Sequence, residues 1–551
     1  MDGLILTTVN RLAAFFAIVV LAAACGGGGG GDDGGAANDT DTDGNLTISG
    51  KATFDLVPHN PANNGLAYGS TSTAPVRNAV IQLVRAADQA VIATAETDSV
   101  GDFSVQSPLN TDVIIRVRAE MVRSGMPGWD VRVVDNTQNN ALYVLESSGF
   151  NTGASDLVRD LHAGSGWGGS SYTGTRSAAP FAIIDGINDA ILGLLSTDPN
   201  SQLPPLIVRW SPDNRAVSGD ESIGEIGNSF FRRIGNNTRE ILLLGNENSD
   251  TDEYDRHVVI HEFGHYFEDA LVRADTIGGA HSNGDRLDPR VAFSEGWGYA
   301  YAGIATGDPV TRDALGFGQA SGFQIDVESN NVLNPGWFSE GSVQSIIYDI
   351  VDLDADGVDA LALGFAPVYD LLTGGMAASV SPITIFSFVA MLKQQNPDDS
   401  AAIDAIVNAQ EIASTTIDEF ATSESNDEGR GSDVLPVYSN LTIDGSSVNV
   451  CALGGDSDFG TYNKLSVRRF VRFDVVVPGN YRIRAAGPAG ADPDIVLHSS
   501  GYLTMSELIG TTETLDIQLA PASYVLETYE YSNTTDDARG RTCIDVSVQS
   551  L

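Results

Sequence analysis

Residues 257–271 read HVVIHEFGHYFEDAL, and three of the chain's seven histidines stand in this stretch at intervals of four. Side chains four residues apart meet on one face of an α-helix, so the spacing predicts a helix with His257, His261 and His265 in a row. The apolar residues between them predict that this helix is buried. Two interpretations follow: the imidazoles are hydrogen-bonded core residues, or some of them bind a metal ion.

The order HEFGH at 261–265 favours the metal ion. Two imidazoles one helical turn apart can present nitrogens to a single Zn²⁺, and a Glu between them lies beside the ion as a general base. A chance match to this pattern is rare in a chain with so few histidines. We therefore expect His261 and His265 as zinc ligands, Glu262 as the base, and His257 as a structural residue.

A catalytic zinc usually has three protein ligands and one position open to water. The segment DPRVAFSEGWGYAYAGIA predicts a second helix, with Asp288 as N-cap and Pro289 at its first position. Glu295 stands in it among apolar and small residues, where an unpaired carboxylate would be costly to bury. Gly296 and Gly298 would let this helix approach the first one closely, so we expect Glu295 as the third ligand.

HEFGH followed by EGWGYA resembles the gluzincin branch of the zincin metallopeptidases, which are thermolysin-like in their core. The resemblance implies zinc on His261, His265 and Glu295. It also implies that Glu262 is base and proton shuttle in peptide-bond hydrolysis, and that residues 240–244 form the edge strand that pairs with an extended substrate.

Peptide hydrolysis also needs a hydrogen-bond donor for the oxyanion. The candidates are Tyr348, Tyr299, Tyr301 and His281, and the sequence does not rank them. His281 stands in a glycine-rich loop, where it either lines the cleft or is exposed.

Aspartates alternate at Asp352, Asp354 and Asp356 ahead of Gly357, as in the first half of a calcium-binding loop. Position twelve of such a loop would be Leu363 instead of Glu, so the pattern is not a complete EF-hand. Two interpretations stay open here: a Ca²⁺ site that stabilises the loop, or an acidic loop without an ion.

The spacing of apolar residues along the sequence divides the chain into three regions. Period-two patterns over 46–145 and again over 426–551 predict two β-sandwiches. Residues 146–425 mix helical periods with strands and hold the histidine helix at their centre. The sequence thus predicts a multidomain fold, with an α+β zincin-like metallopeptidase core flanked by an N-terminal and a C-terminal β-sandwich.

Both predicted sandwiches resemble known modules. PVRNAVIQLVR with IATAETDSVGDFSV resembles the transthyretin-like, carboxypeptidase-regulatory modules of exported enzymes, which implies a spacer or a binding module. The alternative is that residues 46–145 are a propeptide. FVRFDVVVPGNYRIRAA with LAPASYVLETYEY resembles the β-sandwiches appended to the C-terminus of secreted peptidases.

The N-terminal residues 1–25 resemble a bacterial lipoprotein signal, in which the apolar run LAAFFAIVVLAAA ends directly before Cys25. The resemblance implies cleavage before Cys25 and acylation of that cysteine. Residues 26–45, rich in Gly and Asp, would then be a flexible tether. Ala22 and Leu21 depart from the usual signal pattern, and an ordinary cleaved signal peptide is the alternative. We expect an exported lipoprotein anchored to the outer membrane or cell surface.

Cys451 and Cys543 form an even pair in a chain expected to be exported, which predicts a disulfide. Closing a loop of this size would stabilise the fold by ~4–5 kcal/mol in the chain-entropy model.

The formal net charge of −43 gives the chain an acidic surface, which excludes nucleic acid as a partner. The motifs favour an exported, zinc-dependent metalloendopeptidase that acts on a protein or peptide substrate. The alternative is an adhesion or glycan-binding surface lipoprotein with an inactive zincin domain. Glu262 favours the hydrolase, because a purely structural zinc site needs no base.

Replacing Cys25 by Ser should abolish lipid labelling and release the protein from membranes, because a tether of Gly and Asp has no affinity of its own for a bilayer. Metabolic labelling with a fatty acid and membrane fractionation measure both effects. Asn38→Ser in the tether is the matched control. Unchanged membrane retention of the Cys25→Ser protein would contradict the lipid anchor.

Overall fold

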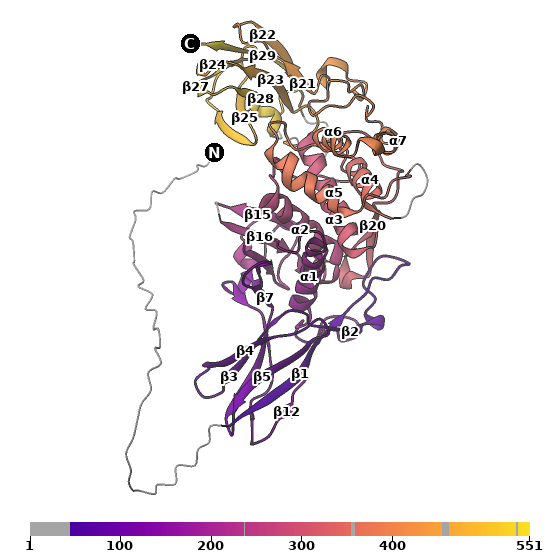
Figure 1. The fold of residues 1–551 in the computed structure, drawn as a ribbon, viewed down its shortest axis with the longest axis vertical. Helices are drawn as coiled ribbons and strands as arrows, with labels where there is room; N and C mark the ends of the chain where they lie inside the picture. Colours follow the sequence, from indigo (N-terminus) through magenta and orange to yellow (C-terminus); the bar gives the residue numbers. More distant parts are fainter. Residues whose placement is uncertain (1–43, 236, 354–358, 455–461, 536–537) are drawn as a thin grey trace, which may run out of the picture. The chain divides into compact units, whose positions relative to one another are not determined.

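The computed structural model describes residues 44–551 except 236, 354–358, 455–461 and 536–537 (Figure 1). Residues 45–551 form one compact unit, which is rich in sheet. The described residues contain seven α-helices: α1 (Ala179–Thr197), α2 (Arg256–Leu271), α3 (Pro289–Thr306), α4 (Glu340–Val351), α5 (Phe365–Asp370), α6 (Ile385–Gln395) and α7 (Ser400–Ala409). Cys25, Asp354 and Asp356 lie outside the described residues.

Two five-stranded, sandwich-like sheets form the N-terminal region. In one, β1 pairs with β2, β5, β12 and β13; in the other, the order is β10-β6-β3-β4, with β11 also on β6. Burial alternates residue by residue along β5 and β6, as their period-two patterns predict. The strands are β1 (Asn45–Leu56), β2 (Ser72–Pro75), β3 (Val80–Arg85), β4 (Val91–Glu96), β5 (Asp102–Pro108), β6 (Asp112–Arg118), β10 (Val144–Glu146), β11 (Phe150–Asn151), β12 (Leu157–Val158) and β13 (Leu161–Ala163).

A third sheet joins strands from both sides of the boundary expected at residue 145. Its order is β15-β16-β14-β8-β7, with β9 on β8, and β14 runs parallel to both β8 and β16. The sheets therefore do not divide where the period of the sequence changes. The strands are β7 (Glu120–Arg123), β8 (Trp129–Asp135), β9 (Ala141–Leu142), β14 (Leu206–Trp210), β15 (Phe230–Ile234) and β16 (Thr238–Leu243).

The strand expected at 240–244 is β16, but the expectation that it is an edge strand is wrong. It lies between β14 and β15, and β15 is the edge. The carboxylate of Glu240 forms ion pairs with Arg209 at 2.6 Å and with Arg232 at 3.0 Å. Arg232 belongs to β15, so the edge strand is joined to β16 by an ion pair as well as by its backbone.

A small sheet of order β17-β18-β19-β20 flanks the N-terminal end of α2. Its strands are β17 (Gly245–Asn246), β18 (Asp250–Thr251), β19 (Val310–Leu315) and β20 (Ser321–Asp326).

Helix α2 packs against β15 and β16 on one side and against α1 and α3 on the other. By length and composition α1 could cross a membrane, but 72% of its apolar window is buried inside the protein. Helix α3 begins as expected: Asp288 is the N-cap, its side chain accepts from the amide of Arg290 at 3.0 Å, and Pro289 is the first helical residue. The histidine helix is therefore enclosed by a sheet and two further helices.

The C-terminal region is a sandwich with its own hydrophobic core. Its sheets have the orders β21-β23-β28-β25-β26 and β22-β29-β24-β27. A disulfide joins Cys451 to Cys543, which stand opposite each other on β22 and β29. The strands are β21 (Tyr438–Asn440), β22 (Ser447–Ala452), β23 (Arg468–Val475), β24 (Gly479–Ala486), β25 (Pro493–His498), β26 (Tyr502–Ser506), β27 (Thr512–Leu519), β28 (Ala522–Glu530) and β29 (Thr542–Ser550).

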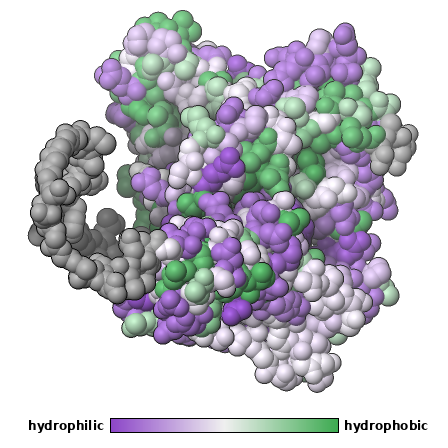
Figure 2. All heavy atoms as spheres, turned by 60° about the horizontal axis from the view of Figure 1, so that its bottom comes forward, coloured by the Kyte–Doolittle hydropathy of each residue, from purple (hydrophilic) through white to green (hydrophobic). Residues whose placement is uncertain are grey.

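The surface is mixed in character. One face, shown in Figure 2, carries hydrophilic residues interspersed with scattered hydrophobic groups. Single apolar side chains at a surface are ordinary and need no partner to explain them.

Replacing Cys451 and Cys543 together by Ser should lower the free energy of unfolding of the C-terminal sandwich by about 2–5 kcal/mol, because the unfolded loop is no longer closed. Thermal unfolding of the double variant beside the wild type measures the loss. A peptide map of the unreduced protein should show the two cysteines linked. Two thiols that react with an alkylating agent would contradict the pairing.

Candidate metal centre

Helices α2 and α3 bring three ligating atoms to one point. His261 Nε2 lies 3.1 Å from His265 Nε2, and Glu295 Oε2 lies 3.3 Å from each of these nitrogens. His261 and Glu295 are buried, and His265 is half-buried. The three atoms form a nearly equilateral triangle.

This triangle has the dimensions of a zinc site. With Zn–N and Zn–O bonds of ~2.0–2.1 Å, the ligand atoms of a tetrahedral ion lie ~3.3 Å apart. Two imidazoles and one carboxylate are also a known ligand set of catalytic zinc. The side chains present therefore fit the ion in both spacing and chemistry.

Glycines allow the two helices to come this close: the expectation is confirmed for Gly298, but Gly296 faces α4 and not α2. A Cβ on Gly264 of α2 would lie 3.0 Å from the Cα of Gly298 of α3. A Cβ on Gly298 would lie 2.7 Å from the ring of His261, and one on Gly296 would lie 2.5 Å from Val343 of α4. Larger residues at these positions would push α3 away from its neighbours.

A second layer of polar groups orients His265. Ser294 Oγ donates to Glu268 Oε2 at 2.6 Å, and it lies 3.1 Å from Nδ1 of His265. Because the hydroxyl hydrogen is engaged with Glu268, Ser294 accepts a hydrogen bond from Nδ1–H. Nε2 of His265 then faces Glu295, as metal ligation requires. Nothing in the local sequence pattern indicates this pair, because Ser294 and Glu268 are ordinary helix residues.

Charge at the centre is balanced between carboxylates and imidazoles. Burial acts to lower the pKa of His265, but Glu295 outweighs it and raises the pKa to about 9. Burial acts to raise the pKa of Glu295, but His281 and His265 hold it well below its usual range. Glu295 is thus a carboxylate, and a metal ion that binds Nε2 of His265 displaces a proton.

His281 lies at the centre and not on an exposed loop. Its Nε2 is 3.2 Å from Glu295 Oε2, and its Nδ1 is 2.7 Å from Glu340 Oε2. It therefore bridges a ligand carboxylate and a buried carboxylate of α4.

The carboxylate of Glu262 accepts no hydrogen bond from any residue that the structure describes, although its side chain is buried. Its charge contributes to the raised pKa values of His265 and Tyr299, which places it near both. A carboxylate beside the ligand triangle that accepts no hydrogen bond from the described residues is suited to accept a proton.

The tyrosine candidates for the oxyanion occupy different surroundings. Tyr301 donates to Ala190 O at 2.9 Å and stacks among core aromatic rings. Tyr348 packs against Gly303 of α3. The ring centroid of Tyr299 lies 4.4 Å from that of His261. Burial, Glu340 and Glu295 raise the pKa of Tyr299 well above its usual value, so its hydroxyl keeps its proton.

His257 points away from the triangle. Its Nε2 lies 3.1 Å from Oγ1 of Thr306, the last residue of α3, and 2.9 Å from Asp308 O just after the helix. This agrees with a structural role.

A second cluster of acidic side chains was not expected from the sequence. Asp250, Asp252, Asp255 and Asp313 each bring one oxygen within 4.8 Å of the others, in an arrangement that could hold a cation. Burial, followed by the neighbouring carboxylates, raises the pKa of Asp250 to about 10, and burial with Asp255 raises that of Asp313 to about 8. The first three precede α2 in the sequence, but Asp313 comes from β19, and no local pattern joins it to them. Of the expected calcium loop, Asp352 is described, and Asp354 and Asp356 lie outside the described residues.

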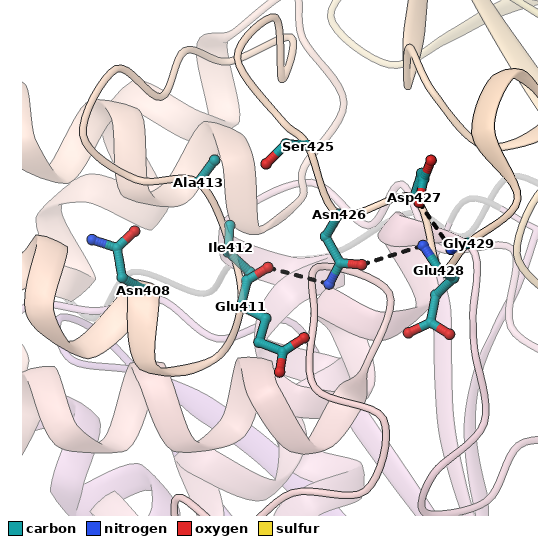
Figure 3. A pocket seen from close by; sticks show the side chains of 9 residues that line it. All are labelled: Asn408, Glu411, Ile412, Ala413, Ser425, Asn426, Asp427, Glu428 and Gly429. Carbon is teal, nitrogen blue, oxygen red and sulfur yellow. Dashed lines mark hydrogen bonds between the residues drawn. The ribbon is translucent and has the colours of Figure 1, made fainter.

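An open cavity of about 620 Å³ lies away from these residues (Figure 3). Several of its polar groups are hydrogen-bonded to one another. Asn426 Nδ2 donates to Glu411 O at 3.2 Å, and Gly429 N donates to Asp427 Oδ1 at 2.8 Å. The cavity adds no group to the metal centre. It is lined by Asn408, Glu411, Ile412, Ala413, Ser425, Asn426, Asp427, Glu428 and Gly429.

No protein-family model and no curated protein matches the chain. One similar solved structure is the pre-peptidase C-terminal domain of a collagenase from Bacillus anthracis, with 19% identity over 20% of this chain and 93% of that one, at a TM-score of 0.16. Another is PliG of Aeromonas hydrophila, a periplasmic inhibitor of g-type lysozyme, with 13% identity over 20% of this chain and 96% of that one, at a TM-score of 0.14. These likenesses are too slight to carry an argument about fold or activity.

Replacing Ser294 by Ala should weaken zinc binding by about 10–100-fold, the usual effect of losing a group that orients a metal-bound histidine. Competition with a chromophoric chelator measures the affinity. Ser196→Ala, at an exposed position of α1, is the matched control and should bind zinc as the wild type does. Equal affinity in both variants would show that Ser294 does not orient His265.

Proposed function

We propose that the protein is a zinc-dependent peptidase whose central region is a zincin-like α+β core of the gluzincin type. The ligand triangle of His261, His265 and Glu295 is the observation that supports this most directly, because two helices bring its atoms within 3.3 Å of one another. The carboxylate of Glu262 beside the triangle distinguishes a hydrolytic centre from a structural one.

A bound zinc ion supplies a Lewis acid that activates water and polarises a carbonyl group. Glu262 accepts the proton of the attacking water and donates it to the leaving amine. Tyr299, whose ring lies beside that of His261, is the candidate donor to the oxyanion, because both ring nitrogens of His281 are engaged with Glu295 and Glu340. Ser294 and Glu268 keep Nε2 of His265 directed at the ion.

We further propose that the protein works outside the cytoplasm as a lipid-anchored protein that cleaves peptides or proteins. The support is the signal-like segment ending at Cys25, together with a disulfide in the C-terminal sandwich, since disulfides persist in oxidising compartments.

Removing a ligand and removing the base should have different effects. Replacing His261, His265 or Glu295 (by Ala, Ala and Gln) should lower zinc occupancy, because each supplies one of three protein ligands. Glu262→Gln should keep zinc and lower the rate of peptide hydrolysis about 10²–10⁴-fold, because only the base is lost. Metal analysis and cleavage of a peptide library measure the two properties separately.

Glu146→Gln, an exposed carboxylate on β10, is the control and should match the wild type in both. Chelation of the wild type should abolish hydrolysis, and added zinc should restore it. A wild type that binds zinc but cleaves no peptide would instead favour a binding lipoprotein with an inactive centre. Full zinc occupancy in Glu295→Gln would contradict the gluzincin ligand set.

A further inference from the structure

The loop between α2 and α3 carries His281, and a segment of the C-terminal region holds this loop in place. Two backbone hydrogen bonds join the loop to this segment. Leu465 N donates to Arg286 O at 2.8 Å, and Asp288 N donates to Asn463 O at 2.8 Å. The segment leads into β23 of the C-terminal sandwich. The His281 loop is therefore attached to a region that follows the metal ligands by a long stretch of chain.

Lys464 fastens the loop on both sides of His281. Its Nζ donates to Ala280 O at 2.8 Å and pairs with Asp285 Oδ2 at 2.9 Å. The same oxygen of Asp285 accepts from Ser282 N at 3.0 Å. The residues before and after His281 are thus both tied, directly or through Asp285, to one ammonium group.

The burial of Lys464 makes these contacts obligatory. Its side chain is only 4% exposed. A buried ammonium is stabilised only where its hydrogen-bonding partners are in place. Ala280 and Asp285, which accept hydrogen bonds from Lys464 Nζ, both belong to the His281 loop. Folding of this segment therefore specifies the position of the loop.

Close packing restricts the loop further. Asn463 Nδ2 donates to Gly278 O at 3.0 Å. Gly279 has a φ of +103°, which favours glycine, and a Cβ there would lie 3.0 Å from Asn463 Nδ2. The loop accordingly has little freedom to shift against the segment.

We propose that Lys464 is a positioning residue of the metal centre: it holds His281 against Glu295, so that the C-terminal sandwich completes the centre. His281 Nε2, 3.2 Å from Glu295 Oε2, then fixes the orientation of a ligand carboxylate. The inference rests on the proposed function, because it takes Glu295 as a zinc ligand.

The test compares four variants of the full-length protein. Lys464→Met keeps the length of the side chain and removes its charge, and Asp285→Asn weakens the same pair from the loop side. Lys464→Arg keeps the charge. Arg482→Met is the matched control, because Arg482 forms an exposed pair with Asp516 at 2.6 Å in the same sandwich.

Three properties are measured: zinc affinity by chelator competition, kcat and KM for a peptide that the wild type cleaves, and the melting temperature. Lys464→Met should bind zinc about 10-fold more weakly or worse and lose kcat to a similar extent, as expected when a group that orients a ligand is displaced. Its KM should change little. Asp285→Asn should change in the same direction, Lys464→Arg should recover most of the loss, and Arg482→Met should match the wild type.

A purely structural role would lower the melting temperature of Lys464→Met while the folded protein kept wild-type zinc affinity and kcat, and that result would overturn the inference. If Lys464→Met does not fold, Asp285→Asn decides by the same two measurements. A wild type that binds zinc without cleaving peptides would end the proposed function, and the zinc affinities of the variants would still decide the role of Lys464. A wild type that binds no zinc would overturn both.

Discussion

The contact between Gly264 of α2 and Gly298 of α3 is the constraint on which the centre depends. Two helices can direct side chains at a single ion only if their backbones come close, and here a single added Cβ would meet a Cα at 3.0 Å. Trp297 Nε1 donates to Gly264 O at 3.1 Å and links the same pair of helices. The sheet packs against the other side of α2, and α4 packs against α3 at Gly296. These contacts hold the two helices together. The ligand triangle is a consequence of this packing.

The sequence predicts the features of the centre that are local. The four-residue spacing of His261 and His265, the cap at Asp288 and the small residues around Glu295 are all legible within one or two turns of helix. Each appears in the structure where the pattern places it. Partners that come from distant segments leave no such pattern. Asp313 joins its cluster from β19, and Lys464 reaches the His281 loop from beyond the central region.

Sheet pairing shows the same limit. The period-two pattern over 46–145 predicts strands there, but it does not show that β8 pairs in parallel with β14 across the boundary expected at residue 145. This pairing bears on whether residues 46–145 are a propeptide. Their removal would take away β8 and expose the hydrogen-bonding edge of β14 to which it pairs. The pairing therefore favours a permanent part of the fold over a segment that is discarded.

The attachment of the His281 loop to the segment at Lys464 also concerns the order of events during synthesis. A chain emerges from its amino end, so the helices with the ligand triangle are available to fold well before the C-terminal sandwich exists. On our proposal, His281 reaches its place against Glu295 only when that sandwich has formed. The nascent chain would then carry an incomplete centre until its last region has folded, which delays proteolytic activity until synthesis is nearly finished.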